Sequence, residues 1–415
     1  MLIEAQAGLP IWALKHLPSG IFAVLFGACV GSFLNVVVYR LPAGISVISP
    51  PSRCPTCGAK LTFFRDNLPV LGWLMLRGKC RTCGVRISPQ YMIIELLVAL
   101  MAGGLYMLLY VWRPGSAWWT EIGNMWWYQS HFYFSWPAFI LLVLLLAGLL
   151  AMTLIDAKQF IIPIEIPLFV TIAAFVLYPI QFMVQSVRPA GPMLRVDWPI
   201  PGTGPAIAGA ALLGMLGVVV AVVLLRMKVF RYSFEDYYDY VDPKDTIGDY
   251  PHARREMFKE LAFLSPVLAG LALGYVIGPF VFGQTVPPLV QVVAASALGY
   301  LVGCGLIWGI RIIGTLGFGR EAMGLGDVHL LGAVGAVLGW YEPILVFFVA
   351  PFSGILWHIG SMFLGAVMGD KARRELPYGP HLAIATLLVI LGRPFLDTVM
   401  TTVLGAIPLP TPGFI

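Results

Sequence analysis

A succession of long apolar runs constrains the fold of this chain more than any other feature of its sequence. The runs lie at 20–41, 90–112, 137–156, 162–184, 204–226, 261–283, 288–310, 327–341, 343–367 and 380–405. About 20 helical residues cross the hydrocarbon core of a bilayer, so every run except 327–341 is long enough to span it. With 59% hydrophobic and 11% charged residues over 415 positions, the chain carries more apolar surface than a soluble domain can bury. We therefore predict an all-α polytopic membrane protein with about 8–10 transmembrane helices.

The basic residues fall mostly on one side of this predicted topology. An N-terminus outside the membrane gives five inner segments, at 40–89, 157–161, 226–260, 311–326 and 368–379. These segments hold 21 of the 26 Lys and Arg residues, which places them in the cytoplasm by the positive-inside rule. The same residues account for the net charge of +5, so the charge indicates no nucleic-acid partner.

Two aspartates lie where apolar runs meet water. Asp156 ends one run, and Asp327 begins another directly after Gly324-Leu325-Gly326. A carboxylate within or beside a membrane helix is costly, so a functional role is the default interpretation. Glycines let the backbone approach a partner closely. We predict a catalytic dyad for peptide hydrolysis, in which one ionised aspartate takes a proton from water and the other, protonated, polarises the scissile carbonyl. Either aspartate could fill either role.

Other interpretations of these carboxylates stay open at this point. Both could be interfacial anchors, in a scaffold without catalytic activity. Asp156 and Asp327, with Glu165 and His329, could instead form the ion pathway of an ion-coupled membrane transporter. Such a transporter predicts paired repeats in the two halves of the chain, and the sequence shows none.

Four cysteines form the strongest local motif. Cys54, Cys57, Cys80 and Cys83 follow the spacing C-x2-C-x22-C-x2-C, and a glycine follows each pair. This pattern is typical of tetrahedral zinc, and four protein ligands leave no position for a catalytic water. A domain of about 48 residues has too little core to fold well alone, which gives a structural metal a clear purpose. We predict structural zinc, with redox-active or metal-free thiols as the alternatives.

These observations predict three parts of the chain. Residues 1–41 are an N-terminal segment with the first transmembrane helix, 42–89 a cytoplasmic four-cysteine zinc domain, and 90–415 a polytopic membrane aspartyl peptidase body. Within the body, the polar insert 228–260 is expected to be a solvated connector, rather than a regulatory or docking segment, and to end in an amphipathic helix from Pro251.

Several blocks of sequence occur in order along nearly the whole chain: Gly31 to Pro42, the two Cys-x-x-Cys pairs, Asp156 with Pro163, Gly324 to Asp327, and Pro377-Tyr378-Gly379-Pro380. Together they resemble the bacterial prepilin peptidase family. The resemblance implies a GxGD-type intramembrane aspartyl protease of the inner membrane, with its active site facing the cytoplasm. Its substrates would be single-span type IV prepilins or pseudopilins, in type IV pilus or type II secretion systems. The resemblance also implies N-methylation of the new N-terminus with S-adenosylmethionine, and contact with membrane lipid.

Three features depart from the family's pattern. Pro163-Ile164 stands where the family usually has Pro-Asp, with Glu165 one position later, so a supporting carboxylate is shifted or missing. His329 stands where lysine is common. The pair of runs at about 204–283 is additional to the family's usual eight spans. The catalytic blocks are intact, so the resemblance indicates the peptidase more strongly than the methyltransferase.

Overall fold

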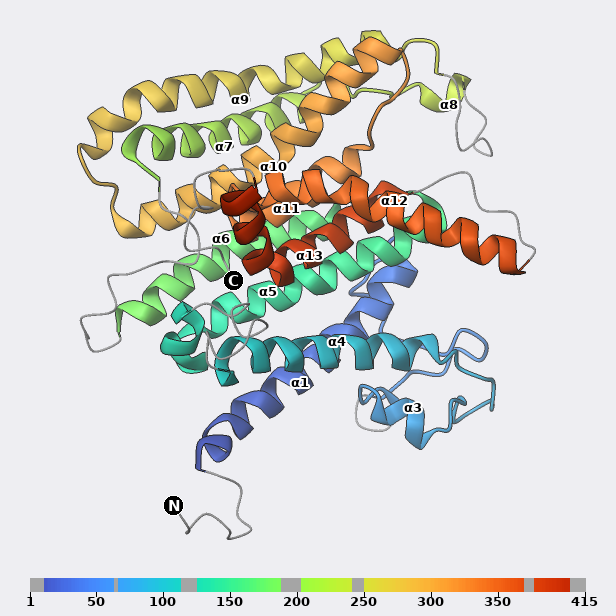
Figure 1. Ribbon diagram of the computed structural model, residues 1–415. Coiled ribbons are helices and arrows are strands. Elements are labelled where there is room, and N and C mark those ends of the chain that lie inside the picture. The colour runs from blue at the N-terminus through green and yellow to red at the C-terminus, as the bar shows by residue number, and fades with distance from the viewer. Residues whose placement is uncertain are drawn as a thin grey trace. The chain divides into compact units, whose positions relative to one another are not determined.

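The computed structural model describes residues 11–62, 66–112, 125–187, 203–240, 250–368 and 377–403. Within these ranges the chain is helical, and the only β-structure is two isolated bridges, Arg53 with Lys60 and Lys79 with Arg86. The elements in order are α1 (Ile11–Arg40), α3 (Leu71–Met75), α4 (Gln90–Tyr106), the π-helical η1 (Met107–Val111), α5 (Met125–Gln159), α6 (Glu165–Ser186), α7 (Pro205–Arg226), α8 (Tyr237–Tyr240), α9 (Ala253–Phe282), α10 (Pro288–Phe318), α11 (Leu325–Leu338), α12 (Glu342–Met368), α13 (Tyr378–Thr398) and the π-helical η3 (Val399–Val403) (Figure 1). The chain divides into two compact units, Met1–Ile155 and Asp156–Ile415. The predicted limits 42–89 of a four-cysteine domain stay a prediction.

The membrane prediction is confirmed. Among the described residues, 8 helices are long and apolar enough to cross a membrane, and two apolar helices are shorter, Leu325–Leu338 and Tyr378–Arg393. Together they match the ten predicted runs. With 14 residues, α11 is about 21 Å long, which is less than the hydrocarbon core of about 30 Å. Its first turn, with Asp327, therefore cannot lie at one surface while its last turn reaches the other.

Two helices extend farther into polar sequence than we predicted. α9 begins at Ala253, where the predicted run begins at 261, and α10 continues to Phe318 through Arg311, which we assigned to a loop. Both extensions carry buried charged side chains, among them Glu260 and Arg311. Hydropathy ends a run at its first charged residue, and it does not register that the charge is buried against a partner.

The polar insert contains a small packed cluster among otherwise mostly exposed residues, where the structure describes it. Phe234 and Tyr237 contact a small cluster of buried residues formed by Tyr250 and Ala253. The Tyr250 hydroxyl donates a hydrogen bond to Asp236 at 2.6 Å. The expectation of a solvated connector stays a prediction, whereas the helix expected at its end is confirmed as the start of α9.

In the first unit, α1 and α4 lie in close contact, and the segment that carries the four cysteines lies between them in sequence. A Cβ on Gly27 would lie 2.6 Å from the Val98 carbonyl oxygen of α4, so only glycine permits this approach. Glu95 of α4 accepts a hydrogen bond at 2.6 Å from the backbone N–H of Val70, directly before α3. α4 thereby anchors the segment that carries the cysteines.

In the second unit, α7 and α9 form a hairpin whose backbones meet at glycines, and Figure 1 shows the two helices side by side. A Cβ on Gly209 would lie 2.7 Å from Gly278 Cα, and one on Gly217 the same distance from Val267 Cα. α10 packs against this hairpin and also against α6 and α11. It thus connects the hairpin to the helices around the two aspartates.

Candidate active site and metal site

The two Cys-x-x-Cys loops share one backbone geometry. In each loop the first cysteine's carbonyl accepts a hydrogen bond at 2.9 Å from the glycine four residues later, Gly58 or Gly84. Both glycines have φ of +70°, a left-handed conformation that other residues adopt at a cost. This explains why a glycine follows each pair: it turns the chain so that the loop's backbone amides face the sulfur atoms.

The four sulfur atoms converge at one point. All lie within 4.8 Å of one another, with Cys54 and Cys83 3.8 Å apart and Cys57 and Cys80 3.9 Å apart. Four sulfurs placed tetrahedrally about 2.3 Å from a zinc ion would be separated by about 3.8 Å, whereas a disulfide needs about 2.05 Å. The geometry therefore fits a metal ion held by four thiolates.

The backbone of each loop favours a thiolate at its first cysteine, whereas burial and the neighbouring sulfur atoms raise the pKa of Cys83 to about 12. Backbone N–H groups of Cys57 and Thr56 lower the pKa of Cys54 to about 6, and those of Cys83 and Thr82 lower the pKa of Cys80. A thiolate, not a thiol, is the metal ligand. Cys54 and Cys80 are thus the ligands that the loop backbone favours as thiolates before a cation binds.

Asp156 lies in the last turn of α5 and is 6% exposed. Its Oδ2 accepts a hydrogen bond at 3.2 Å from the backbone N–H of Gly379, in the first turn of α13. A Cβ on Gly379 would lie 2.7 Å from the same oxygen, so a larger residue would displace the carboxylate. The sequence alone does not identify Gly379 as a site residue, although the pattern Pro377-Tyr378-Gly379-Pro380 at a helix start is a signal that points to it.

Asp327 lies in the first turn of α11 and is 8% exposed. Gly324 is the N-cap residue, and its backbone N–H lies beside the Asp327 carboxylate, whose Oδ2 would lie 3.2 Å from a Cβ on Gly324. A side chain that reaches back from the third helical position to the N-cap N–H is half of a capping box. The other oxygen, Oδ1, is buried and has no hydrogen-bond partner among the described residues.

The structure brings the two aspartates together. Their charges lie close enough to interact, and the Tyr378 hydroxyl also lies within the field of Asp327. Ile162, in the loop after α5, fills the space between the helix starts: a Cβ on Gly326 would lie 2.6 Å from its Cβ, and one on Gly379 would lie 2.8 Å from its Cδ1. The loop after α5 and the first turns of α11 and α13 therefore form one site.

The residues that a transporter would need do not join this site. Glu165 is exposed at the start of α6, and His329 lies within hydrogen-bond distance of the Tyr300 hydroxyl, at 3.2 Å from Nδ1. Of the four polar side chains considered for an ion pathway, only Asp156 and Asp327 are thus shown together in the described part of the chain.

Comparison with known proteins gives two family matches. Residues 25–109, which include the four cysteines, match the bacterial peptidase A24 N-terminal domain. Residues 264–359, which include Gly324, Gly326 and Asp327, match the type IV leader peptidase family. Asp156 lies outside both matched segments, so its place beside Asp327 rests on the structure.

Named relatives extend the match. A prepilin leader peptidase/N-methyltransferase of Myxococcus xanthus is 51% identical over 81 residues, which cover 20% of this chain and 24% of the relative. Proteins of the same name from Aeromonas salmonicida and Stutzerimonas stutzeri are 24% and 26% identical, and the alignments cover 94% and 89% of both chains. No solved structure matches the chain. This multi-pass membrane protein thus carries two segments, in order, that match these family models, and it is similar over nearly its full length to prepilin leader peptidase/N-methyltransferases.

Proposed function

We propose that the chain is an intramembrane aspartyl endopeptidase whose catalytic groups are Asp156 and Asp327. The observation that carries this proposal is the convergence of two buried carboxylates, one of which has an oxygen without a hydrogen-bond partner in the described structure. Two nearby carboxylates do not easily ionise together, so they share a proton and titrate as a pair.

This shared proton supplies the chemistry of peptide hydrolysis. The ionised aspartate removes a proton from a water molecule as its oxygen adds to the scissile carbonyl, and the protonated aspartate donates its proton to the carbonyl oxygen. The resulting tetrahedral intermediate collapses, the C–N bond breaks, and the leaving amine receives a proton from the dyad. Gly379 orients Asp156 and Gly324 orients Asp327 through their backbone N–H groups.

We further propose that the substrates are single-span prepilins or pseudopilins, cut at the cytoplasmic face of the inner membrane. Support comes from the names of the relatives and from the 21 of 26 basic residues on the predicted inner side. A basic leader is favoured on that face by the same rule and by the negative surface of the inner leaflet. Because the scissile backbone must be extended to expose its carbonyl, a glycine before the cut is physically suitable.

Cleavage by the purified protein tests this function directly. The assay uses a single-span substrate with a basic leader and a glycine before the cut, and compares wild type with Asp156→Asn and Asp327→Asn. We expect both variants to fold and to lose cleavage, whereas Glu165→Gln retains it. A β-branched residue in place of the substrate glycine should block processing, and moved leader charges should change it only mildly. Efficient cutting of soluble peptides without an apolar segment would contradict the proposal.

We propose that Cys54, Cys57, Cys80 and Cys83 hold one structural zinc ion, because their sulfur spacing fits tetrahedral coordination. The ion would fix the two loops relative to each other and supply no catalytic water. Elemental analysis of the purified protein should find one zinc per chain, and a Cys57→Ser, Cys83→Ser variant should contain none. Folded protein that contains no metal would contradict this assignment.

The relatives' names also support N-methylation of the new N-terminus with S-adenosylmethionine. A pocket of about 240 Å³ opens between α1 and the segment that carries the four cysteines, with Ser32, Arg40 and Asn67 among its lining residues. Its lining includes no carboxylate, and no feature of the pocket identifies that cofactor. Methyl transfer is therefore proposed from the relatives alone, and labelled methyl incorporation into the cleaved substrate tests it.

A further inference from the structure

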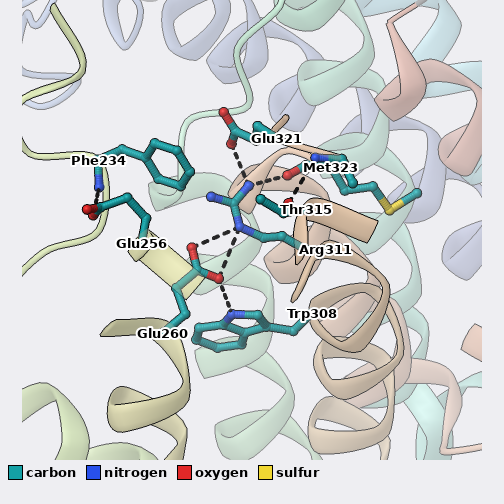
Figure 2. Close-up of polar contacts among 9 residues, drawn as sticks. Phe234, Glu256, Glu260, Trp308, Arg311, Thr315, Glu321 and Met323 are labelled. Atoms are coloured by element: carbon teal, nitrogen blue, oxygen red, sulfur yellow. Dashed lines mark hydrogen bonds and ion pairs between the residues drawn. The ribbon is translucent and has the colours of Figure 1, made fainter. Parts of the chain in front are cut away.

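A buried arginine, Arg311, lies at the centre of an ion-pair network beside the candidate active site (Figure 2). It is 2% exposed, and its Nε donates to both carboxylate oxygens of Glu260, at 3.0 and 3.2 Å. Its Nη1 donates to Glu321 at 2.5 Å and to the backbone carbonyl of Met323. Trp308 donates a further hydrogen bond to Glu260 at 2.8 Å. One guanidinium thus joins α9, α10 and the segment that leads into α11.

The burial of this ion-pair network has a large desolvation cost, so it is an inefficient way to stabilise helix packing. Desolvation of buried charges can cancel their attraction, so apolar side chains of similar volume often stabilise a fold as well or better. What an arginine adds is geometry, because its planar fork fixes several acceptors in defined directions. A role in orienting a neighbouring group therefore explains the buried Arg311 better than a contribution to stability alone.

The group that Arg311 could position is the peptide unit between Met323 and Gly324. Arg311 binds the carbonyl of Met323, and the N–H of the same peptide unit, that of Gly324, lies beside the Asp327 carboxylate, whose Oδ2 would lie 3.2 Å from a Cβ on Gly324. A peptide unit is planar, so fixing its carbonyl also fixes the direction of its N–H. A carbonyl bonded to a cation also polarises the peptide unit, which strengthens the N–H as a donor. Thr315 accepts the N–H of Ala322 at 3.1 Å and steadies the same segment.

The α7–α9 hairpin holds the other side of the guanidinium. Glu260 belongs to α9, which meets α7 backbone to backbone through glycines. One turn earlier, Glu256 accepts the Phe234 N–H at 2.8 Å, and the Phe234 ring lies 5.3 Å from the Arg311 guanidinium carbon. Phe234 of the insert and Glu260 of α9 therefore both lie beside the Arg311 guanidinium, on the side away from Met323, as Figure 2 shows.

We propose that Arg311 is a positioning residue, which sets the Met323–Gly324 peptide and through it the Asp327 carboxylate, and that α9 serves as its brace through Glu260. This rests on the proposed catalytic role of Asp327. The hairpin then belongs to the working enzyme: it fixes the geometry of the active site from outside the dyad and does not touch the substrate.

The experiment measures kcat, KM and thermal unfolding for full-length Arg311→Lys, Glu260→Gln and Glu321→Gln, with the single-span substrate. Arg311→Lys keeps the charge but not the fork. We expect kcat to fall by about 10- to 100-fold, since a displacement of about 1 Å can cost as much, with KM changed less than about twofold. Glu321→Gln, whose side chain is 39% exposed, tests the same geometry in a variant that should fold.

The matched control is a second buried ion pair, Arg393 with Glu342 at 2.7 Å, which joins α13 to α12. Glu342→Gln should lower the unfolding temperature as Glu260→Gln does, yet leave kcat near wild type. If kcat is unchanged in both Arg311→Lys and Glu321→Gln, or falls equally in the control, the positioning role is wrong. If Asp327→Asn cleaves normally, the proposed function is wrong instead.

Discussion

The aspartate pair and the Arg311 network contain the same functional group in opposite circumstances. Glu260 is 4% exposed and both its oxygens accept hydrogen bonds, from Arg311 and Trp308. Asp327 is 8% exposed and one of its oxygens has no partner among the described residues. A buried polar group without a partner is costly, so a fold that keeps one forgoes stability at that position. The difference separates a carboxylate that holds structure from one that is available for reaction.

Glu260 and the two aspartates are also held in place by different kinds of donor. The glutamate is fixed by side chains, which bind it from several directions and neutralise its charge. The aspartates are fixed by backbone N–H groups, Gly379 for Asp156 and Gly324 for Asp327, which orient one oxygen and leave the charge to the dyad. Backbone donors carry no proton that could be lost to the reaction. The surroundings therefore specify position without consuming reactivity.

The largest expected effect comes from Asp327→Asn, which removes one of the two carboxylates proposed to be reactive. The amide cannot exchange the shared proton, so cleavage should fall by roughly 10⁴-fold. Stability in denaturant should not decrease, because the change removes a charge whose Oδ1 has no partner among the described residues. Asp156→Asn should behave alike. Normal turnover by either variant would show that the pair is not the catalytic dyad.

Removal of Arg311 tests whether the Arg311–Glu260 ion pair stabilises the fold. Arg311→Met leaves the buried Glu260 charge without its partner, and we expect a loss of about 3–5 kcal/mol in the free energy of unfolding. The double variant Arg311→Met, Glu260→Leu removes both charges and should recover most of that loss. Denaturant unfolding in detergent measures both. A double variant as unstable as the single one would contradict the view that desolvation offsets the pair.

Gly379→Ala should move Asp156 without changing its chemistry. The new Cβ would lie 2.7 Å from the carboxylate oxygen, so we expect a loss of about 1–3 kcal/mol from overpacking and a decrease of about 10²-fold in kcat. Gly392→Ala is the control in the same helix, because a Cβ there would meet nothing within 4 Å. Equal effects of both substitutions on kcat would mean that α13 tolerates neither for general reasons.

The smallest effect is expected at a half-buried surface carboxylate, Asp236. The hydrogen bond from Tyr250 lowers the pKa of Asp236, so its contribution to stability is present above the ordinary carboxyl pKa of about 3.9. That contribution is lost as the pH falls through the lowered value. Asp236→Asn should therefore lower the unfolding temperature slightly at neutral pH, with the difference vanishing in acid. Asp239→Asn is the control, and a difference that grows in acid would reverse the assigned sign.

The parts of this molecule that sequence predicts well are local. The Cys-x-x-Cys-Gly loops are complete within five residues each, and the structure confirms that their sulfurs converge. The apolar runs likewise predict the helices, because the length and apolar composition of each run are enough to identify a spanning helix. The proximity of Asp156 and Asp327 was predicted from their positions at run ends, which the structure supports, while their catalytic role stays a proposal.

What sequence could not predict depends on partners far along the chain. Arg311 lies in a stretch that hydropathy assigns to a loop, yet it is buried because Glu260, from another helix, lies opposite. Neither residue alone indicates the other. Ile162 is similar: an ordinary apolar residue, it gains its place only because Gly326 and Gly379 leave room for it.

The glycine seam between α7 and α9 bears on how this chain can change over generations. Gly209, Gly217 and Gly274 face backbone atoms of the opposite helix, where even one methyl group has no room. On the same hairpin, Val219 and Val223 are exposed on the surface of the unit. Substitutions should therefore accumulate freely on one side of these helices and hardly at all on the other. We therefore expect the amino-acid sequence of the α7–α9 hairpin to change at very different rates on its two faces.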